Sequence, residues 1–152
     1  PEMWNKVKET ILYLKSKGLK VDGLGWQGHL RDNVVLSLNK EKIDYLLSII
    51  DWAHQNDLDF HVTEIDYRLV GTNPSSNAYE RQANGYSNIL KTLISKRENG
   101  VVTFNTWGVY DKNSVSDHEF KYIYDSNLKP KKAVEVLKKT LKNKSSSYVY
   151  FD

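Results

Sequence analysis

The segment His61–Asp66, with the sequence HVTEID, ends on two carboxylates that are separated by one residue. Side chains two residues apart in a strand point to the same face, so Glu64 and Asp66 are expected to lie together. Like charges this close are costly unless a positively charged or hydrogen-bonding group pairs with them. His29, which ends an earlier extended segment, is our candidate for that partner.

Polar and aromatic residues also end the two other extended segments. Gln27 and His29 lie in the sequence WQGH, and Trp107 lies in NTWG. A strand-end glutamate is more often a solvated loop residue, and a lone tryptophan is more often part of a core. Taken together, however, a carboxylate held by an Asp–His pair beside an aromatic platform is typical of a carbohydrate site. In such a site the carboxylate attacks an anomeric carbon.

These residues are carried by segments that alternate between helical and extended patterns. Apolar residues recur at helical spacing in residues 2–17, after a predicted cap at Asn39 as far as Ala53, in residues 78–97, and after Pro130. Extended segments at residues 19–29, 59–66 and 101–109 lie between them. The order is one helix followed by three strand–helix units of roughly 40 residues, which predicts an α/β fold with three adjacent parallel strands.

The predicted sheet determines where the chemistry should lie. In parallel sheets of this kind, functional residues gather at the carboxyl ends of the strands. We therefore expect Gln27, His29, Glu64 and Trp107 at one end of the sheet. We also expect His29 within hydrogen-bond distance of both Glu64 and Asp66.

Composition narrows the class of protein. The chain has 152 residues, of which 39% are hydrophobic and 27% charged, which fits one globular domain. Its net charge of +3 is mild and its lysines lie mostly in helical patterns, so we expect no nucleic-acid partner. No apolar run has membrane-spanning length, no signal-peptide pattern opens the chain, and no membrane partner is expected.

We expect neither a metal nor a cofactor. The chain contains no cysteine, which rules out disulfides and thiolate metal sites. Asp111, Asp117 and His118 share one polar loop, but their spacing fits no standard cation site. Glycine-rich phosphate loops and serine nucleophile elbows are also absent from the sequence.

Four motifs resemble, in order and spacing, the C-terminal half of glycoside hydrolase family 10. They are VDGLGWQGH, VTEID, TWGVYD and LKPKKAVEVL, and the matching region runs from about residue 5 to residue 142. The family consists of retaining endo-1,4-β-xylanases on a (β/α)8 barrel. The resemblance implies that residues 1–143 are the C-terminal part of such a TIM barrel and that residues 144–152 are a tail.

The resemblance also assigns roles to the residues already singled out. Glu64 matches the catalytic nucleophile, His29 the histidine that hydrogen-bonds the nucleophile, and Asp66 the aspartate that orients the histidine. Gln27 matches a glutamine that lines the same sugar subsite, and Trp107 a tryptophan beneath the sugar at the cleavage point. The substrate implied is xylan or a xylo-oligosaccharide, and the implied location is secreted or at the cell surface.

Two departures from the family pattern affect the expected activity. Ser114 is followed by Val115, where the family usually has a Ser-Trp pair. The family's acid/base glutamate, in an Asn-Glu pair at the end of the fourth strand, has no counterpart. Retaining hydrolysis needs two carboxyl groups about 5 Å apart, and a complete barrel needs about 250 residues. We therefore expect the missing N-terminal part of the barrel as a partner, self-association of the chain, and no useful hydrolysis of xylan by the chain in isolation.

Two other functions remain open. A non-catalytic carbohydrate-binding module derived from the same fold would explain the missing acid/base residue and the missing second tryptophan. Another retaining β-glycosidase would also fit, because Trp-Gly and Thr-Glu strand ends are not restricted to one substrate.

Overall fold

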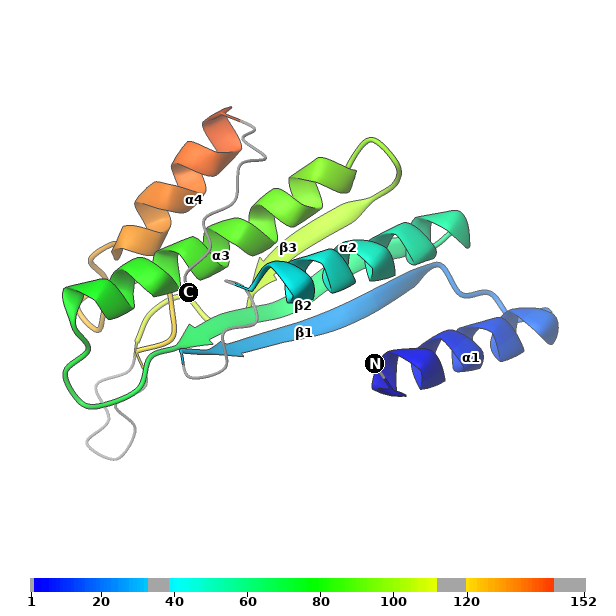
Figure 1. Cartoon of the computed structure of the whole chain (residues 1–152), viewed down its shortest axis with the longest axis horizontal. Coiled ribbons are helices and arrows are strands. Elements are labelled where there is room, and N and C mark those ends of the chain that lie inside the picture. Colours follow the sequence, from blue (N-terminus) through cyan, green and yellow to red (C-terminus); the bar gives the residue numbers. More distant parts are fainter. Residues whose placement is uncertain (1, 33–38, 112–119, 144–152) are drawn as a thin grey trace.

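The computed structural model describes residues 2–32, 39–111 and 120–143. The tail at 144–152, Ser114 and Val115, and the loop residues Asp117 and His118 lie outside the described residues. Within the described residues, the helices and strands follow in the order α1 (Glu2–Ser16), β1 (Gly23–Arg31), α2 (Lys40–Gln55), β2 (Asp59–Arg68), α3 (Ser76–Lys96), β3 (Val102–Thr106) and α4 (Lys132–Asn143) (Figure 1).

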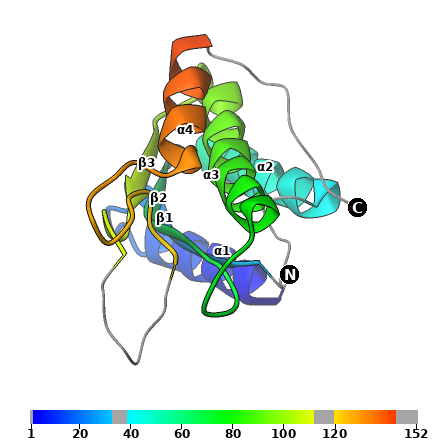
Figure 2. The same ribbon diagram turned by 90° about the vertical axis from the view of Figure 1, so that its left-hand side faces the viewer.

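The three strands form one parallel sheet in the order β1-β2-β3, as predicted. Helices α2 and α3 pack on one face of the sheet, and α4 packs on α3 (Figure 2). The alternation of strands and helices is therefore confirmed. No described helix covers the opposite face, on which the polar strand-end residues lie.

Local capping explains where the helices begin and end. The side chain of Asn39 accepts a hydrogen bond from the backbone N–H of Lys42 at 3.2 Å, which confirms the predicted cap of α2. Ser75 caps α3 in the same way, through the N–H of Ala78, so this helix starts two residues earlier than predicted. Gly18 follows α1 with a φ of +73°, a conformation that favours glycine after a helix.

The core lies between the sheet and the layer formed by α2 and α3. Its largest fully buried side chains include Leu30, Ile43, Ile49, Ile50, Phe60, Ile65, Tyr67, Tyr86 and Leu93. Helix α1 contributes one buried side chain, Ile11, and lies at the margin of the molecule beside β1 (Figure 1). The sheet is therefore stabilised mainly by α2 and α3, and its strands carry all the predicted site residues except Trp107.

The boundaries of all three strands differ from the prediction, and β1 begins at Gly23 instead of residue 19. Strand β3 ends at Thr106 instead of residue 109, because the chain turns there and Gly108 packs against Tyr122. A methyl group at position 108 would lie 2.5 Å from Cε1 of Tyr122, so this close approach requires Gly108. Strands β1 and β2 each run two residues further than expected, to Arg31 and Arg68.

Candidate active site

A β-bulge in β2 brings the polar side chains into register. Trp26 is aligned with Val62, but the next residue of β1, Gln27, is aligned with Glu64. Thr63 is thus an extra residue on β2, and the register between β2 and β3 shifts at the same place. Bulges of this kind redirect side chains and are frequent next to active sites. Here the bulge places Glu64 opposite Gln27 on the face that the helices leave uncovered.

His29 joins the two carboxylates, as the spacing predicted. Its Nε2 lies 3.2 Å from Oε2 of Glu64 and its Nδ1 lies 3.1 Å from Oδ2 of Asp66. The second oxygen of Glu64 accepts a hydrogen bond from Nε2 of Gln27 at 3.3 Å. Both oxygens of Glu64 are therefore held, while 21% of its side chain stays exposed and can be reached by a ligand.

Asp66 is the buried anchor of this chain of contacts. Only 7% of its side chain is exposed. The pKa of the nearby Tyr86 hydroxyl is raised well above its ordinary value, first by burial and then by the charge of Asp66. Tyr86 accordingly stays neutral and donates to the carbonyl oxygen of Lys121 at 2.6 Å.

A neutral imidazole has one N–H, so His29 donates to both carboxylates at once only when it carries two protons.

Trp107 stands beside His29 at the carboxyl end of the sheet. The ring centroids of Trp107 and His29 lie 6.2 Å apart, with the two planes at 84°. The backbone N–H of Trp107 donates to the carbonyl oxygen of Ile65 at 3.0 Å, which ties the residue to β2. With 55% of its surface exposed, Trp107 is accessible to solvent beside His29. All the predicted site residues are therefore brought to one end of the sheet.

A buried ion pair fixes the segment that carries Trp107. Nζ of Lys131 lies 2.8 Å from Asp111, with 7% and 6% of the two side chains exposed. The other oxygen of Asp111 accepts from the backbone N–H groups of Lys121 and Tyr122 at 3.0 and 2.9 Å. Burial lowers the pKa of Lys131, while its hydrogen bond to Asp111 opposes that shift. Asp111 thus connects the segment after β3 to the residue that precedes α4.

We expect the substitution Lys131→Met to destabilise the fold by about 3–5 kcal/mol, because it leaves the charge of Asp111 buried without its partner. Urea unfolding followed by circular dichroism measures this loss. The control is Lys132→Met, which breaks the neighbouring ion pair with Glu80, where about half of each side chain is exposed. That variant should lose less than about 1 kcal/mol. Equal losses in the two variants would contradict the role assigned to the buried pair.

The two other histidines that the structure describes, His54 and His61, have structural contacts. Nδ1 of His61 lies 3.0 Å from the hydroxyl of Thr103, and Nε2 of His54 lies 3.3 Å from the carbonyl oxygen of Val101. In the part of the chain that the structure describes, no three His, Cys, Asp or Glu side chains are grouped to hold a metal ion. Nor is any helix there long and apolar enough to cross a membrane.

Sequence reasoning missed two arginines that continue the same face. Arg31 follows His29 by two residues and Arg68 follows Asp66 by two, and the two arginines are aligned across β1 and β2. The period of two that pairs Glu64 with Asp66 extends directly to Arg68. This signal was available in the sequence once the strands were extended to their observed ends.

Comparison with known proteins relates the whole arrangement to one family. The model of glycosyl hydrolase family 10 matches residues 2–140. An endo-1,4-beta-xylanase of Geobacillus stearothermophilus is 24% identical over 148 residues, which cover 88% of this chain and 43% of the relative. An exoglucanase of Acetivibrio thermocellus, XynX, is 29% identical over 135 residues, or 85% of this chain and 12% of the relative.

Solved structures agree with the family match. Xylanase 10B from Thermotoga petrophila, solved in complex with xylobiose, superposes with a TM-score of 0.77 and 25% identity over 92% of this chain. The Penicillium canescens xylanase XylE shares the fold with the same TM-score at 20% identity. The chain covers 42% of each of these two structures. The three strands and their helices are thus part of a (β/α)8 barrel, as predicted.

Proposed function

Because this chain belongs to glycosyl hydrolase family 10, we propose that it is the part of a retaining endo-1,4-β-xylanase that carries the nucleophile, Glu64. The observation that supports the role is the continuous contact from Asp66 through His29 to Glu64, with Gln27 on the other oxygen of the carboxylate. A nucleophilic carboxylate has to be ionised, oriented and reachable, and these contacts serve the first two needs.

The proposed reaction is a double displacement. An oxygen of Glu64 forms a bond to the anomeric carbon of a xylose unit while the bond to the leaving sugar oxygen breaks. The leaving oxygen takes a proton from an acid/base residue that we place outside this chain. Water then gives a proton to the same acid/base residue and attacks the anomeric carbon, which releases Glu64 as a carboxylate and restores the original configuration. His29 and Gln27 hold the carboxylate throughout, Asp66 holds His29, and Trp107 supports the sugar ring.

Covalent labelling tests the proposal without the missing acid. A 2-deoxy-2-fluoro-xylobioside with dinitrophenolate as its leaving group needs no proton for departure, and its fluorine slows release of the intermediate. We expect mass spectrometry to find one xylobiosyl group on the peptide that contains Glu64. Labelling of another carboxylate, or no labelling of the folded chain at concentrations that saturate binding, would contradict the assignment.

We expect His29→Ala to slow labelling by about 100-fold, because a nucleophile that loses its orienting contact is misplaced on the scale at which reaction geometry matters. The rate of dinitrophenolate release measures the effect. His61→Gln is the matched control, since His61 lies on the same strand as Glu64 but contacts Thr103. A wild-type labelling rate in the His29→Ala variant would show that His29 does not orient the nucleophile.

One relative supports a second candidate function. The matching protein of Acetivibrio thermocellus is named an exoglucanase, so a glucan is the competing substrate for the same nucleophile. Parallel labelling with the fluorinated xylobioside and the corresponding cellobioside separates the two, because only the glucose units carry a hydroxymethyl group. We expect the xylobioside to react faster. Binding of either sugar without labelling would instead favour the non-catalytic module.

The proposed partners follow from the same assignment. We propose xylan or its oligosaccharides as the substrate, and the N-terminal part of the barrel as the partner that completes the pocket. We also propose self-association of the chain in isolation, because β1 and β3 each have one edge that pairs with no other described strand. We further propose that the protein acts outside the cell or at the cell surface, because its proposed substrate is a polymer.

A further inference from the structure

The bulge in β2 is bonded by side chains on both of its flanks. On the side of β3, the two residues Thr63 and Glu64 lie opposite one residue, Asn105. On the side of β1, the register shifts between Trp26 and Gln27. A bulge disrupts the ladder of backbone hydrogen bonds, and backbone groups that lose a ladder partner need another one. The proposed nucleophile is thus one of the bulged residues, and its direction depends on how the bulge is held.

Asn105 holds the bulge from the side of β3. Its Nδ2 donates to the carbonyl oxygen of Val62, the residue before the bulge, at 3.1 Å. The same nitrogen donates to the hydroxyl oxygen of Thr103 at 3.3 Å, and that oxygen lies 3.0 Å from Nδ1 of His61. The amide nitrogen of asparagine carries two hydrogens, so it can serve both acceptors. Asn105 therefore ties β3 to the backbone immediately before the bulge.

Thr63 holds the bulge from the side of β1. Its hydroxyl donates to the carbonyl oxygen of Trp26 at 3.1 Å, and Trp26 is the last residue of β1 before the shift in register. A methyl group at position 25 would lie 3.1 Å from Cγ2 of Thr63. The side chain of Thr63 thus fits closely over β1 because Gly25 leaves the space for it.

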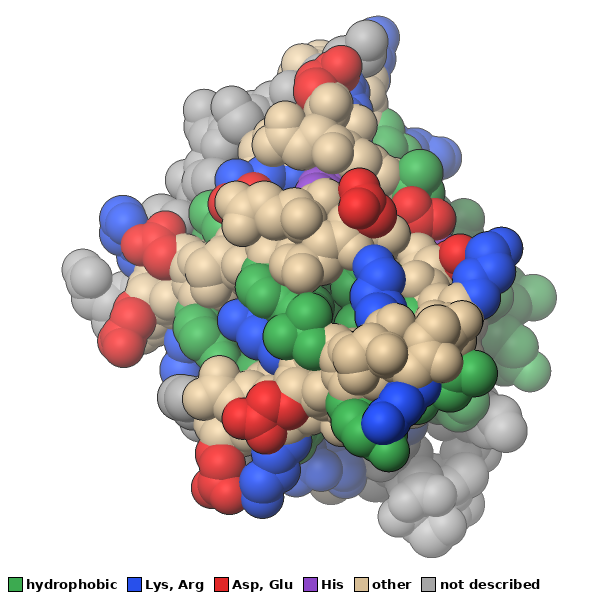
Figure 3. All heavy atoms as spheres, turned by 90° about the vertical axis from the view of Figure 1, so that its right-hand side faces the viewer, with side chains coloured by type: hydrophobic (Ala, Val, Ile, Leu, Met, Phe, Trp, Pro, Cys, Tyr) green, Lys and Arg blue, Asp and Glu red, His purple; other side chains and the backbone are tan. Residues whose placement is uncertain are grey.

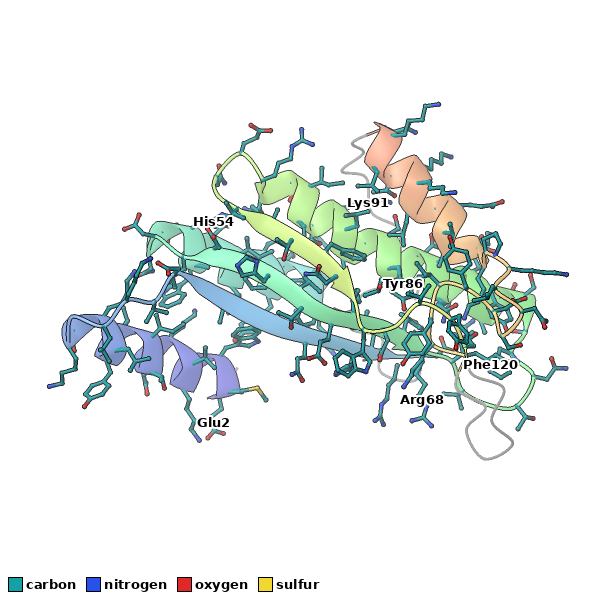
Figure 4. All side chains as sticks on the ribbon, turned by 180° about the vertical axis from the view of Figure 1, so that it is seen from behind. Glu2, His54, Arg68, Tyr86, Lys91 and Phe120 are labelled. Carbon is teal, nitrogen blue, oxygen red and sulfur yellow. The ribbon has the colours of Figure 1, made fainter. Side chains whose placement is uncertain are left out.

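Both residues lie on the face of the sheet that no described helix covers. Thr63 and Asn105 are exposed, and Figure 4 shows their face of the sheet, with His54 near its amino end and Arg68 at its carboxyl end. At the amino end, acidic and basic side chains are interspersed over the surface (Figure 3). The two residues belong instead to the polar face on which the candidate active site lies.

We propose that Asn105 and Thr63 are positioning residues for the nucleophile, Glu64. The inference rests on the proposed function, because it concerns the same carboxylate. Gln27 and His29 bond the carboxylate itself, whereas Asn105 and Thr63 bond the two carbonyl oxygens that flank the bulge and act through the backbone. A displacement of about 1 Å in a reacting group can slow a reaction by about 100-fold. Loss of either bond should therefore slow the attack of Glu64 and leave binding of the sugar unchanged.

Labelling kinetics with the fluorinated xylobioside test the proposal, because they separate the limiting rate from the concentration that gives half of it. We expect Asn105→Ala and Thr63→Val each to lower the limiting rate about tenfold, and to change the half-maximal concentration by less than about twofold. Thr63→Ser keeps the hydroxyl and should label at the wild-type rate. Thr103→Val is the control for Asn105, because it removes the second acceptor and leaves the bond to Val62. It should also label at the wild-type rate.

Circular dichroism establishes first which variants are folded. Because Asn105→Ala and Thr63→Val act on opposite flanks, either one that folds decides the outcome. Wild-type labelling rates in the folded variants would overturn the inference and leave the proposed function intact. A loss in Thr63→Ser equal to that in Thr63→Val would also overturn it, since packing and not the hydroxyl would then explain the effect. Failure of the folded wild-type chain to label would count against the proposed function itself.

Discussion

Replacing Glu64 with glutamine should lower the rate of dinitrophenolate release from an activated xylobioside by about four orders of magnitude or more, the scale seen when a covalent nucleophile is removed. Glutamine keeps the size of the side chain, and its one amide oxygen can still accept a hydrogen bond from Gln27 or from His29. A neutral amide cannot form the glycosyl ester, however, so the loss would report the chemistry of the carboxylate and not its packing.

Chemical rescue distinguishes a nucleophile from a residue that merely supports the site. In Glu64→Ala the lost side chain leaves room for a small anion, and added azide should restore dinitrophenolate release and give an α-xylobiosyl azide. That product has the inverted configuration, since azide attacks from the face that Glu64 occupied. Glu98→Gln is the control, because Glu98 is exposed and pairs with its neighbour Arg97. A Glu64→Gln variant with full activity would place the nucleophile elsewhere.

Local patterns predicted the elements and the composition of the site. The spacing of apolar residues identified the helices, Asn39 identified the start of α2, and the period of two grouped Glu64 with Asp66. These signals depend on neighbours in the sequence, so they can be recognised before the fold is known. The convergence of Gln27, His29 and Trp107 followed from one further rule, that parallel strands end at the same edge of a sheet.

Features that depend on tertiary contacts could not be predicted. The bulge at Thr63 determines that Gln27 faces Glu64, and nothing in the types of these residues indicates an extra residue in β2. The buried pairing of Asp111 was not predicted either, because its partner Lys131 lies 20 residues further along the chain. Strand β3 was predicted too long because Trp107 suits a strand. Its neighbour Gly108 is instead needed where Tyr122 closes the turn.

The chain should distinguish sharply between leaving groups. We expect it to release dinitrophenolate from the activated xylobioside and to release no measurable reducing sugar from xylan. Dinitrophenolate departs without a proton, whereas a sugar oxygen needs a general acid, a contribution of about 10²- to 10⁴-fold. The other carboxylate of the described site, Asp66, is 5% exposed and bound to His29, so it is not available to protonate a leaving group beside Glu64.

Adding the N-terminal part of a family 10 xylanase in trans should restore xylan hydrolysis and change the rate on the activated substrate much less, because only the first reaction needs the acid. The same mixture made with Glu64→Gln should stay inactive on both substrates, which assigns any recovered activity to this chain's carboxylate. Xylan hydrolysis by the pure chain, abolished in Glu64→Gln, would show that an acid within this chain completes the pair. The opposite outcome is a folded chain that binds the activated substrate without turning it over. Because this substrate needs no proton for its leaving group, the missing acid would not explain such inactivity. That result would make the protein a binding module.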